Sequence, residues 1–65
     1  MKANRAYELL ASQRHVEIVE IDSGEVVLFW DTHPSDTGRL ARALRADLAQ
    51  LDADEFLAKW RRYEG

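Results

Sequence analysis

Hydrophobic residues are concentrated in residues 15–31, where they occupy both faces of two expected strands. The apolar positions are Val16, Ile18, Val19, Ile21, Val26, Val27, Leu28, Phe29 and Trp30. β-Branched and aromatic residues at this density are typical of strands, and residues 22–24, which end in Gly24, supply a turn between them. The pattern predicts an antiparallel β-hairpin. A two-stranded sheet is marginal by itself, so its apolar faces need other elements packed against them.

The turn chemistry also predicts how the two strands pair. Ser23 is disfavoured at positive φ, so a type I turn followed by Gly24 in the left-handed region suits these residues better than a two-residue loop. The predicted pairs are Val16 with Trp30, Ile18 with Leu28, Val19 with Val27, and Glu17 with Phe29. A two-residue loop gives as many apolar pairs, so turn chemistry alone separates the two registers.

Helical periodicity flanks the hairpin on both sides. Residues 3–13 are rich in good helix formers and predict a first helix, whose apolar face holds Ala3, Ala6, Tyr7 and Leu10. Pro34 ends the second strand, and a second helix is expected at residues 36–50, capped by Ser35 or Asp36. Its apolar stripe consists of Leu40, Leu44, Leu48 and Leu51, with Arg39, Arg42 and Arg45 on the opposite side.

A third helix is expected to begin at Asp52. Asp52 with Glu55 matches a capping box, and Leu51 with Phe56 matches a hydrophobic staple. The apolar face of this helix consists of Ala53, Phe56, Leu57, Trp60 and Tyr63. The element order is then α-β-β-α-α. The predicted fold is a small α+β single domain, residues 1–65, with an antiparallel hairpin packed on three short helices.

Composition narrows the function classes. A chain of 65 residues buries only ~60% of the surface that its unfolded form exposes. The absence of cysteine excludes disulfides and thiolate zinc sites and fits a cytoplasmic location. No segment reaches the ~20 apolar residues of a membrane span, so no membrane partner is expected. The net charge of −3 argues against a generic nucleic-acid binder.

Catalytic chemistry has little support in the residue pattern. The candidate metal ligands are His15, Asp31, His33 and Asp36, but their spacing matches no known metal site, so we expect no metal and no cofactor. The hydroxyls that could pair with the histidines are those of Ser12, Ser23 and Ser35. No orienting third group or oxyanion hole accompanies them. We therefore expect no enzymatic activity.

Two features leave alternatives open. Arg39, Arg42 and Arg45 are expected to form a solvated face of the second helix, or else a basic face toward nucleic acid. The acidic residues of the hairpin, which are Glu17, Glu20, Asp22 and Glu25, argue against nucleic acid. Trp30 lies where the hairpin meets the following loop, and its pattern fits a core residue and an interface anchor equally.

The chain resembles the N-terminal β-hairpin docking domains of non-ribosomal peptide synthetases and hybrid polyketide synthases, as in the tubulysin assembly line. The likeness rests on residues 8–11, on the hairpin from Val16 to Trp30 and on the Leu- and Arg-rich residues 38–48. It covers most of the chain by pattern, and none of these residues is diagnostic of the family. The resemblance implies a small, often dimeric domain that captures the C-terminal peptide of an upstream subunit as an added strand in antibiotic biosynthesis.

One departure from the family concerns charge. The family hairpin is usually basic toward an acidic tail, whereas this hairpin is acidic, so we expect a partner segment that carries Lys or Arg. The predicted partner-binding residues are Glu17, Glu20, Glu25, Val27, Leu28, Phe29 and Trp30. We predict a docking module that acts by strand addition and forms a homodimer, with hairpin residues or the apolar remainder of the first and third helices at the interface. The alternative is a small regulatory protein that associates with nucleic acid through the second helix.

Overall fold

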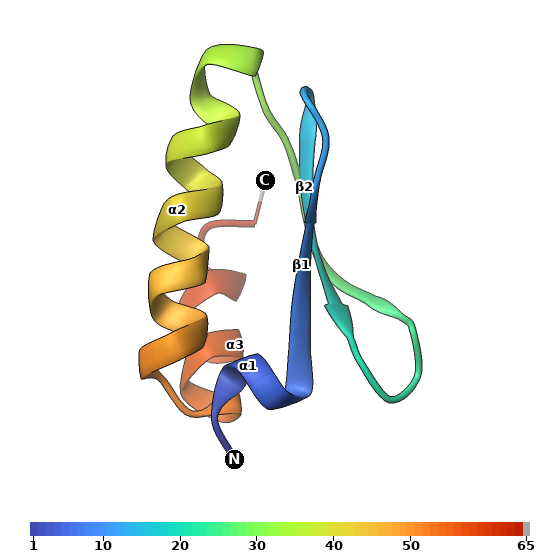
Figure 1. The fold of residues 1–65 in the computed structure, drawn as a ribbon, viewed down its shortest axis with the longest axis vertical. Helices are drawn as coiled ribbons and strands as arrows, with labels where there is room; N and C mark the ends of the chain where they lie inside the picture. The colour runs from blue at the N-terminus through green and yellow to red at the C-terminus, as the bar shows by residue number, and fades with distance from the viewer. Residues whose placement is uncertain (65) are drawn as a thin grey trace.

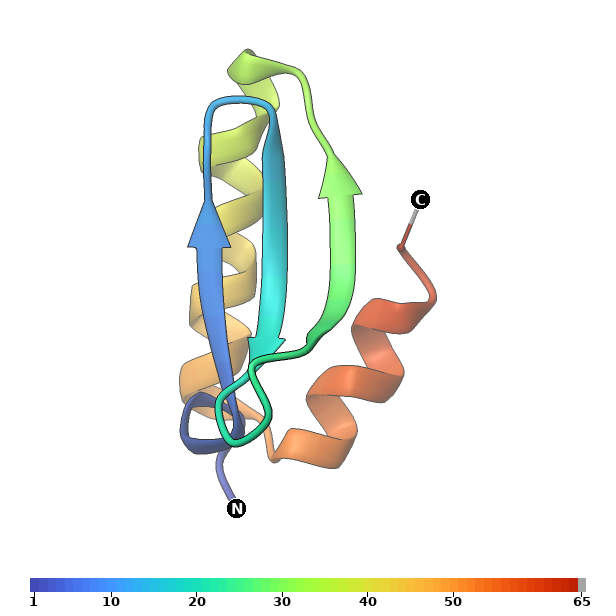
Figure 2. The same cartoon turned by 90° about the vertical axis from the view of Figure 1, so that its right-hand side faces the viewer.

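A computed structural model describes residues 1–64. It contains a three-stranded antiparallel sheet in the order β1-β2-β3 and two longer helices that cover one face of this sheet, while the other face is uncovered (Figure 1, Figure 2). The elements are α1 (Ala3–Ala6), β1 (Tyr7–Ala11), β2 (His15–Glu20), β3 (Val26–Asp31), α2 (Pro34–Gln50) and α3 (Ala53–Arg61). The predicted α+β class is confirmed, and the observed order is α-β-β-β-α-α.

The helix predicted over residues 3–13 is wrong beyond its first turn. Residues 7–11 form β1, which pairs antiparallel with β2 along its whole length. Tyr7 is buried and Leu9 half-buried, whereas Glu8 and Leu10, which follow them, are exposed, which is the period of two of a strand. Helix propensity is a weak prior of a few tenths of a kcal/mol per residue, and the backbone pairing with β2 outweighs it.

The turn between β1 and β2 carries no strong sequence signal. Residues 13–14 connect the strands without Gly or Asn, and no non-glycine residue of the described chain has a positive φ. The Ser12 N–H donates to the His15 carbonyl oxygen at 2.9 Å, and the Ser12 hydroxyl lies 2.8 Å from His15 Nδ1. Because neither turn residue has a positive φ, the turn needs no glycine.

The register of the predicted hairpin is confirmed over most of its length. Val16 pairs with Trp30, Glu17 with Phe29, and Ile18 with Leu28. Gly24 has the expected left-handed backbone, with φ of 74°. The last hydrogen-bonded residue of β2 before the loop is one residue earlier than predicted. It is Glu20, whose N–H donates to the Glu25 carbonyl oxygen. A bulge follows Ile18, so Val19 lies opposite Val26 and not Val27.

Helix α2 begins two residues before the predicted start. His33 is its N-cap in place of Ser35 or Asp36, and Pro34 takes the first helical position, where its missing N–H costs nothing. The predicted stripe is confirmed: its members, Leu40, Leu44, Leu48 and Leu51, are buried or half-buried against the core. One buried polar side chain, Thr37, donates to the Gln13 carbonyl at 2.8 Å and so ties α2 to the β1–β2 turn.

Helix α3 starts after Asp52 as predicted, but the capping box is wrong. The Asp52 side chain makes no capping hydrogen bond. The Ala53 N–H donates instead to the Met1 carbonyl, and the Ala3 N–H donates to the Leu51 carbonyl, both at 2.9 Å. The N-terminal residues therefore pair with the α2–α3 corner and supply an acceptor for the first amide of α3.

The core lies between the sheet and the two longer helices. Its largest fully buried side chains are Val16, Ile18, Leu28, Leu44 and Phe56. Trp30 packs edge-to-face on Trp60 with ring centroids 6.0 Å apart, and it is only 7% exposed. Trp30 is thus a core residue, which decides the alternative left open by its position. Tyr63 lies beyond the end of α3 and is exposed, so the apolar face of that helix ends at Trp60.

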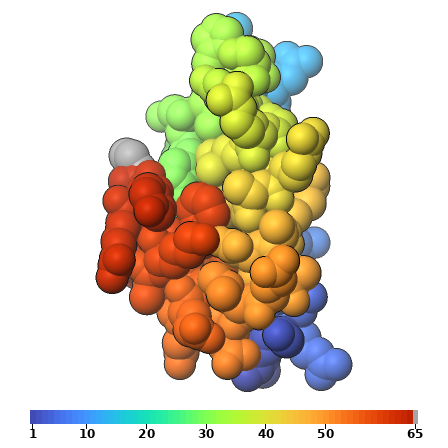
Figure 3. Space-filling view, turned by 90° about the vertical axis from the view of Figure 1, so that its left-hand side faces the viewer, coloured from blue at the N-terminus to red at the C-terminus, as the bar shows by residue number. Residues whose placement is uncertain are grey.

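Neither α2 nor α3 exposes a large apolar side chain. Figure 3 shows α2 and α3 side by side over the sheet. Lys59 donates to Asp47 at 2.6 Å and the Trp60 indole N–H donates to the same carboxylate oxygen at 3.0 Å, which joins the two helices. Within residues 1–64, no helix is long and apolar enough to cross a membrane.

Candidate docking surface

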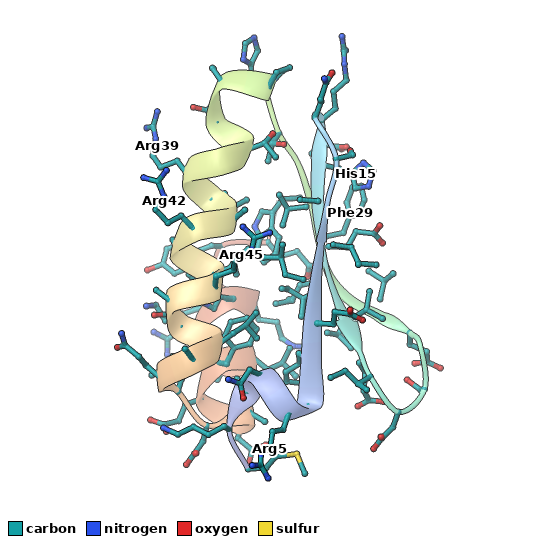
Figure 4. The ribbon with its side chains drawn as sticks, viewed as in Figure 1. Arg5, His15, Phe29, Arg39, Arg42 and Arg45 are labelled. Atoms are coloured by element: carbon teal, nitrogen blue, oxygen red, sulfur yellow. The ribbon has the colours of Figure 1, made fainter. Side chains whose placement is uncertain are left out.

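The uncovered face of the sheet carries both apolar and acidic side chains. We define it by the residues that the strand register places there: Glu8, Leu10, His15, Glu17, Val19, Val26, Phe29 and Asp31. Leu10 is 46% exposed, Val26 51% and Phe29 38%. Figure 4 shows His15 and Phe29 on the side of the sheet away from α2. An apolar group of this kind on a small protein is typical of a contact site.

The predicted partner-binding residues are divided between two sides of the sheet. Glu17 and Phe29 lie on the uncovered face, as a docking role requires. Leu28 is fully buried, Trp30 nearly so, and Val27 packs against the core. The prediction is wrong for Leu28 and Trp30, because alternate residues of the apolar run in β3 face the helices, whereas the half-buried Val27 stays a prediction.

The two remaining predicted residues lie at the loop between β2 and β3. Glu25 is exposed and Glu20 is half-buried. A Glu20 carboxylate oxygen accepts a hydrogen bond from the Ser23 hydroxyl at 2.7 Å, and the Glu25 N–H donates to the same hydroxyl at 3.2 Å. Part of the acidic character predicted for binding therefore stabilises the loop itself.

His15 is held in place on the uncovered face by three neighbours. Its ring stacks on Phe29 with centroids 5.5 Å apart, its Nδ1 lies 2.8 Å from the Ser12 hydroxyl, and its Nε2 lies 3.4 Å from Glu17. The row from Ser12 through His15 to Glu17 has the order of a nucleophile, a base and an orienting acid. These three residues are open to water and belong to β2 and the turn between β1 and β2. We therefore assign them to closing this turn and holding the His15 ring.

The outer edge of β3 is covered by the chain itself at Phe29 and Trp30. The backbone N–H and C=O of Phe29 point away from β2, because the flanking residues Leu28 and Trp30 form the backbone hydrogen bonds to β2. The Phe29 N–H donates to a Glu64 carboxylate oxygen at 2.9 Å, and the Trp30 indole N–H donates to the Tyr63 carbonyl at 2.8 Å. Figure 2 shows the segment after α3 beside this edge.

The outer edge of β1 is open. The Ile21 N–H bonds to the Ala6 carbonyl and Ser12 bonds to His15, so the alternation of an antiparallel pair turns the backbone groups of Leu9 and Ala11 away from β2. No hydrogen-bond partner of these groups lies within the described part of the chain. In Figure 2, α2 lies behind β1 and not beside it.

The three arginines of α2 are all exposed, as predicted. Arg39 lies 3.6 Å from Asp36, whereas no ion pair of Arg42 or Arg45 exists among residues 1–64. Arg39 and Arg42 point away from the sheet in Figure 4. Arg45 lies on the flank of α2 opposite Asp47, the residue that contacts α3, and this flank is the one toward β1.

His33, another candidate metal ligand, has a structural role. His33 Nδ1 accepts from the Ser35 N–H at 3.2 Å and caps α2. In residues 1–64, no three side chains of His, Cys, Asp or Glu are grouped so that they could hold a metal ion. A surface hollow at the start of α3 is lined by Met1, Asp52, Ala53 and Asp54, away from the uncovered face.

The sequence-based prediction missed the outward backbone groups of Leu9 and Ala11, the exposed Leu10 and the Glu64 contact. The alternation of Tyr7, Leu9 and Ala11 with Glu8 was the signal for β1. No protein-family model, curated protein or solved structure matches the chain.

Proposed function

We propose that this chain is a non-catalytic docking module that binds an extended segment of a partner protein as a fourth strand beside β1. The observation that carries the proposal is the difference between the two sheet edges. The outward N–H of Phe29 is bonded to Glu64, while the outward groups of Leu9 and Ala11 have no partner in the described chain. Unpaired edges are templates for strand pairing.

The docking edge lies one strand away from the predicted position. Strand addition was expected at the hairpin of β2 and β3, but β1 already occupies the β2 side of that hairpin. The β3 side is closed at Phe29. The edge of β1 is therefore the place where an incoming strand displaces nothing.

Leu9 and Ala11 each offer one N–H and one C=O to an added strand. Each backbone hydrogen bond contributes about 1 kcal/mol net, which supports a weak and reversible association. Selectivity must then come from the side chains of the added strand, which alternate between its two faces.

Charge on the two sides of β1 supports a specific pattern in the partner. Arg45 flanks β1 on the helix side and is exposed without an ion pair in the described chain. Glu8 and Leu10 flank it on the uncovered face. We expect acidic residues of the partner strand toward Arg45, and apolar or basic residues beside Leu10 and Glu8. The basic residues expected of the partner from the sequence would then occupy one face only.

The biological setting of this proposal follows from the resemblance described above. We propose that the chain acts at a subunit junction of a peptide or polyketide assembly line in the cytoplasm, with the C-terminal peptide of an upstream subunit as the partner. A small acidic α+β domain with an open strand edge is suited to such a role.

A selected peptide and a matched pair of variants test the proposal. Short peptides displayed on phage are selected against the chain, and their binding is mapped by amide chemical shifts. Ala11→Pro removes an N–H that points away from β2, so it removes no hydrogen bond between β1 and β2. Ala11 is exposed, and proline is tolerated at such edge positions. We expect Ala11→Pro to abolish peptide binding and Ala11→Ser to preserve it. Equal binding to both variants would contradict docking at this edge.

A second candidate is favoured by the unpaired state of Arg42 and Arg45 in the described chain. It is the regulatory protein that associates with nucleic acid through α2. A titration with an oligonucleotide at several salt concentrations separates the candidates, because phosphate contacts weaken steeply with salt. Saturable, salt-sensitive binding that Arg42→Gln and Arg45→Gln remove would favour this candidate.

A further inference from the structure

We propose that the uncovered face is a second docking surface, separate from the β1 edge, and that it binds a cationic amphipathic helix of a partner. This surface goes beyond the strand-addition role. Its apolar residues extend across all three strands: Leu10 on β1, Val19 on β2, and Val26 and Phe29 on β3. The three on the outer strands are each more than one-third exposed, so burying them favours association.

Charge identifies the partner. Three carboxylates share the face, those of Glu8, Glu17 and Asp31, and His15 is its one basic residue. Glu17 lies between Leu10 and Phe29 in one cross-strand row. A partner that covers Leu10 and Phe29 must therefore meet this carboxylate, and Lys or Arg beside the apolar stripe of the partner satisfies it.

A second copy of the chain fits this face poorly. Two copies related by a two-fold axis would bring the acidic residues of both faces together, and like charges across an interface are unfavourable. The cationic surface of α2 in another copy is also unsuitable, because the apolar stripe of that helix is buried in its own core. The occupant is therefore a separate cationic segment.

The geometry favours a helix over a strand. The backbone groups in the middle of the sheet are used in the ladders between the strands, so only side chains are available on this face. The outer strands of a three-stranded sheet are about 10 Å apart, which matches the ~10 Å diameter of an α-helix. Helix α2 already packs on the opposite face of the same sheet (Figure 1).

The test uses two synthetic amphipathic helices with the same leucine face, one with lysine and one with glutamate on the polar face. We expect the Leu/Lys peptide alone to bind, with amide shifts at Leu10, Val19 and Phe29. Phe29→Ser should weaken binding about tenfold. Glu17→Gln should weaken it about threefold, whereas Asp54→Asn, an equal charge change on exposed α3, should leave it unchanged.

The outcomes also separate this proposal from docking at β1. Ala11→Pro should leave binding of the Leu/Lys peptide intact, because that variant alters only the sheet edge. Equal binding of both peptides, equal effects of Glu17→Gln and Asp54→Asn, or amide shifts confined to α2 would overturn the proposal. Self-association of the chain through Leu10 and Phe29 would also overturn it, since a second copy would then be the occupant.

Discussion

The backbone N–H of Phe29 donates a hydrogen bond to the side-chain carboxylate of Glu64, 35 residues away along the chain, at 2.9 Å. A hydrogen bond from the Trp30 indole to the Tyr63 carbonyl, at 2.8 Å, lies beside it. Together they hold the segment after α3 against β3. Natural proteins often protect an edge strand by covering it, and among residues 1–64 the β3 edge is covered at Phe29 while the β1 edge has no such contact.

Glu64→Ala should open the β3 edge. The Phe29 N–H loses its acceptor, so its hydrogen exchange should become faster, while exchange at Leu9 and Ala11 should stay as it is. The loss of stability should be below about 1 kcal/mol, because the contact is exposed. Amide exchange followed by NMR measures both effects, and an unchanged rate at Phe29 would mean that the contact does not protect the edge.

Thr37→Val should destabilise the protein more than its conservative shape suggests. Thr37 is buried and donates to the Gln13 carbonyl, so valine removes the donor and leaves that carbonyl without this bond. We expect a loss of about 1–3 kcal/mol. Thr37→Ser keeps the hydroxyl and serves as the control. Equal unfolding free energies for the two variants in urea would show that the hydroxyl contributes little.

Two aspartates at the helix pair should differ in their effect on stability. Asp47 accepts from both Lys59 and Trp60 and its side chain is 19% exposed, so Asp47→Ala should cost about 1–3 kcal/mol. Asp52 makes no side-chain cap bond, so Asp52→Ala should cost less than about 0.5 kcal/mol. Thermal unfolding of both variants tests this order. A larger loss of stability for Asp52→Ala than for Asp47→Ala would indicate that the Asp52 side chain caps α3.

The homodimer predicted from the sequence stays a prediction, and the structure offers the open β1 edge for it. If two copies pair there, the melting temperature should rise with protein concentration, and Ala11→Pro should remove this dependence. Sedimentation at low and high concentration measures the assembly. A monomer at all concentrations would leave the β1 edge free for a partner strand.

The long-range features of the fold were only partly predictable. The leucine stripe of α2 and the pairing of Val16 with Trp30 follow from local patterns, and both are confirmed. Strand β1 was missed because residues 7–11 are good helix formers and because the turn at Ser12 lacks glycine. Its strand state depends on β2, which is a tertiary contact that local propensity does not contain.

The prediction of the candidate site also suffered from the missing strand β1. A predicted sheet without β1 has two strands, so both of its free edges belong to the hairpin of β2 and β3. Leu28 and Trp30 were expected at an interface because an unbroken apolar run gives no indication of which residues face the core. The covered edge at Phe29 depends on Glu64, and no local pattern connects residues so far apart in sequence.

The most direct test of docking at β1 is amide hydrogen exchange of the chain with and without a peptide selected for binding. In the free protein, the outward amides of Leu9 and Ala11 should exchange quickly. With the peptide bound at saturation, both should be protected at least tenfold, because each amide gains a strand hydrogen bond, while Phe29 and Asp31 should change little. Protection at Phe29 and Asp31 without protection at Leu9 and Ala11 would contradict the proposed docking edge.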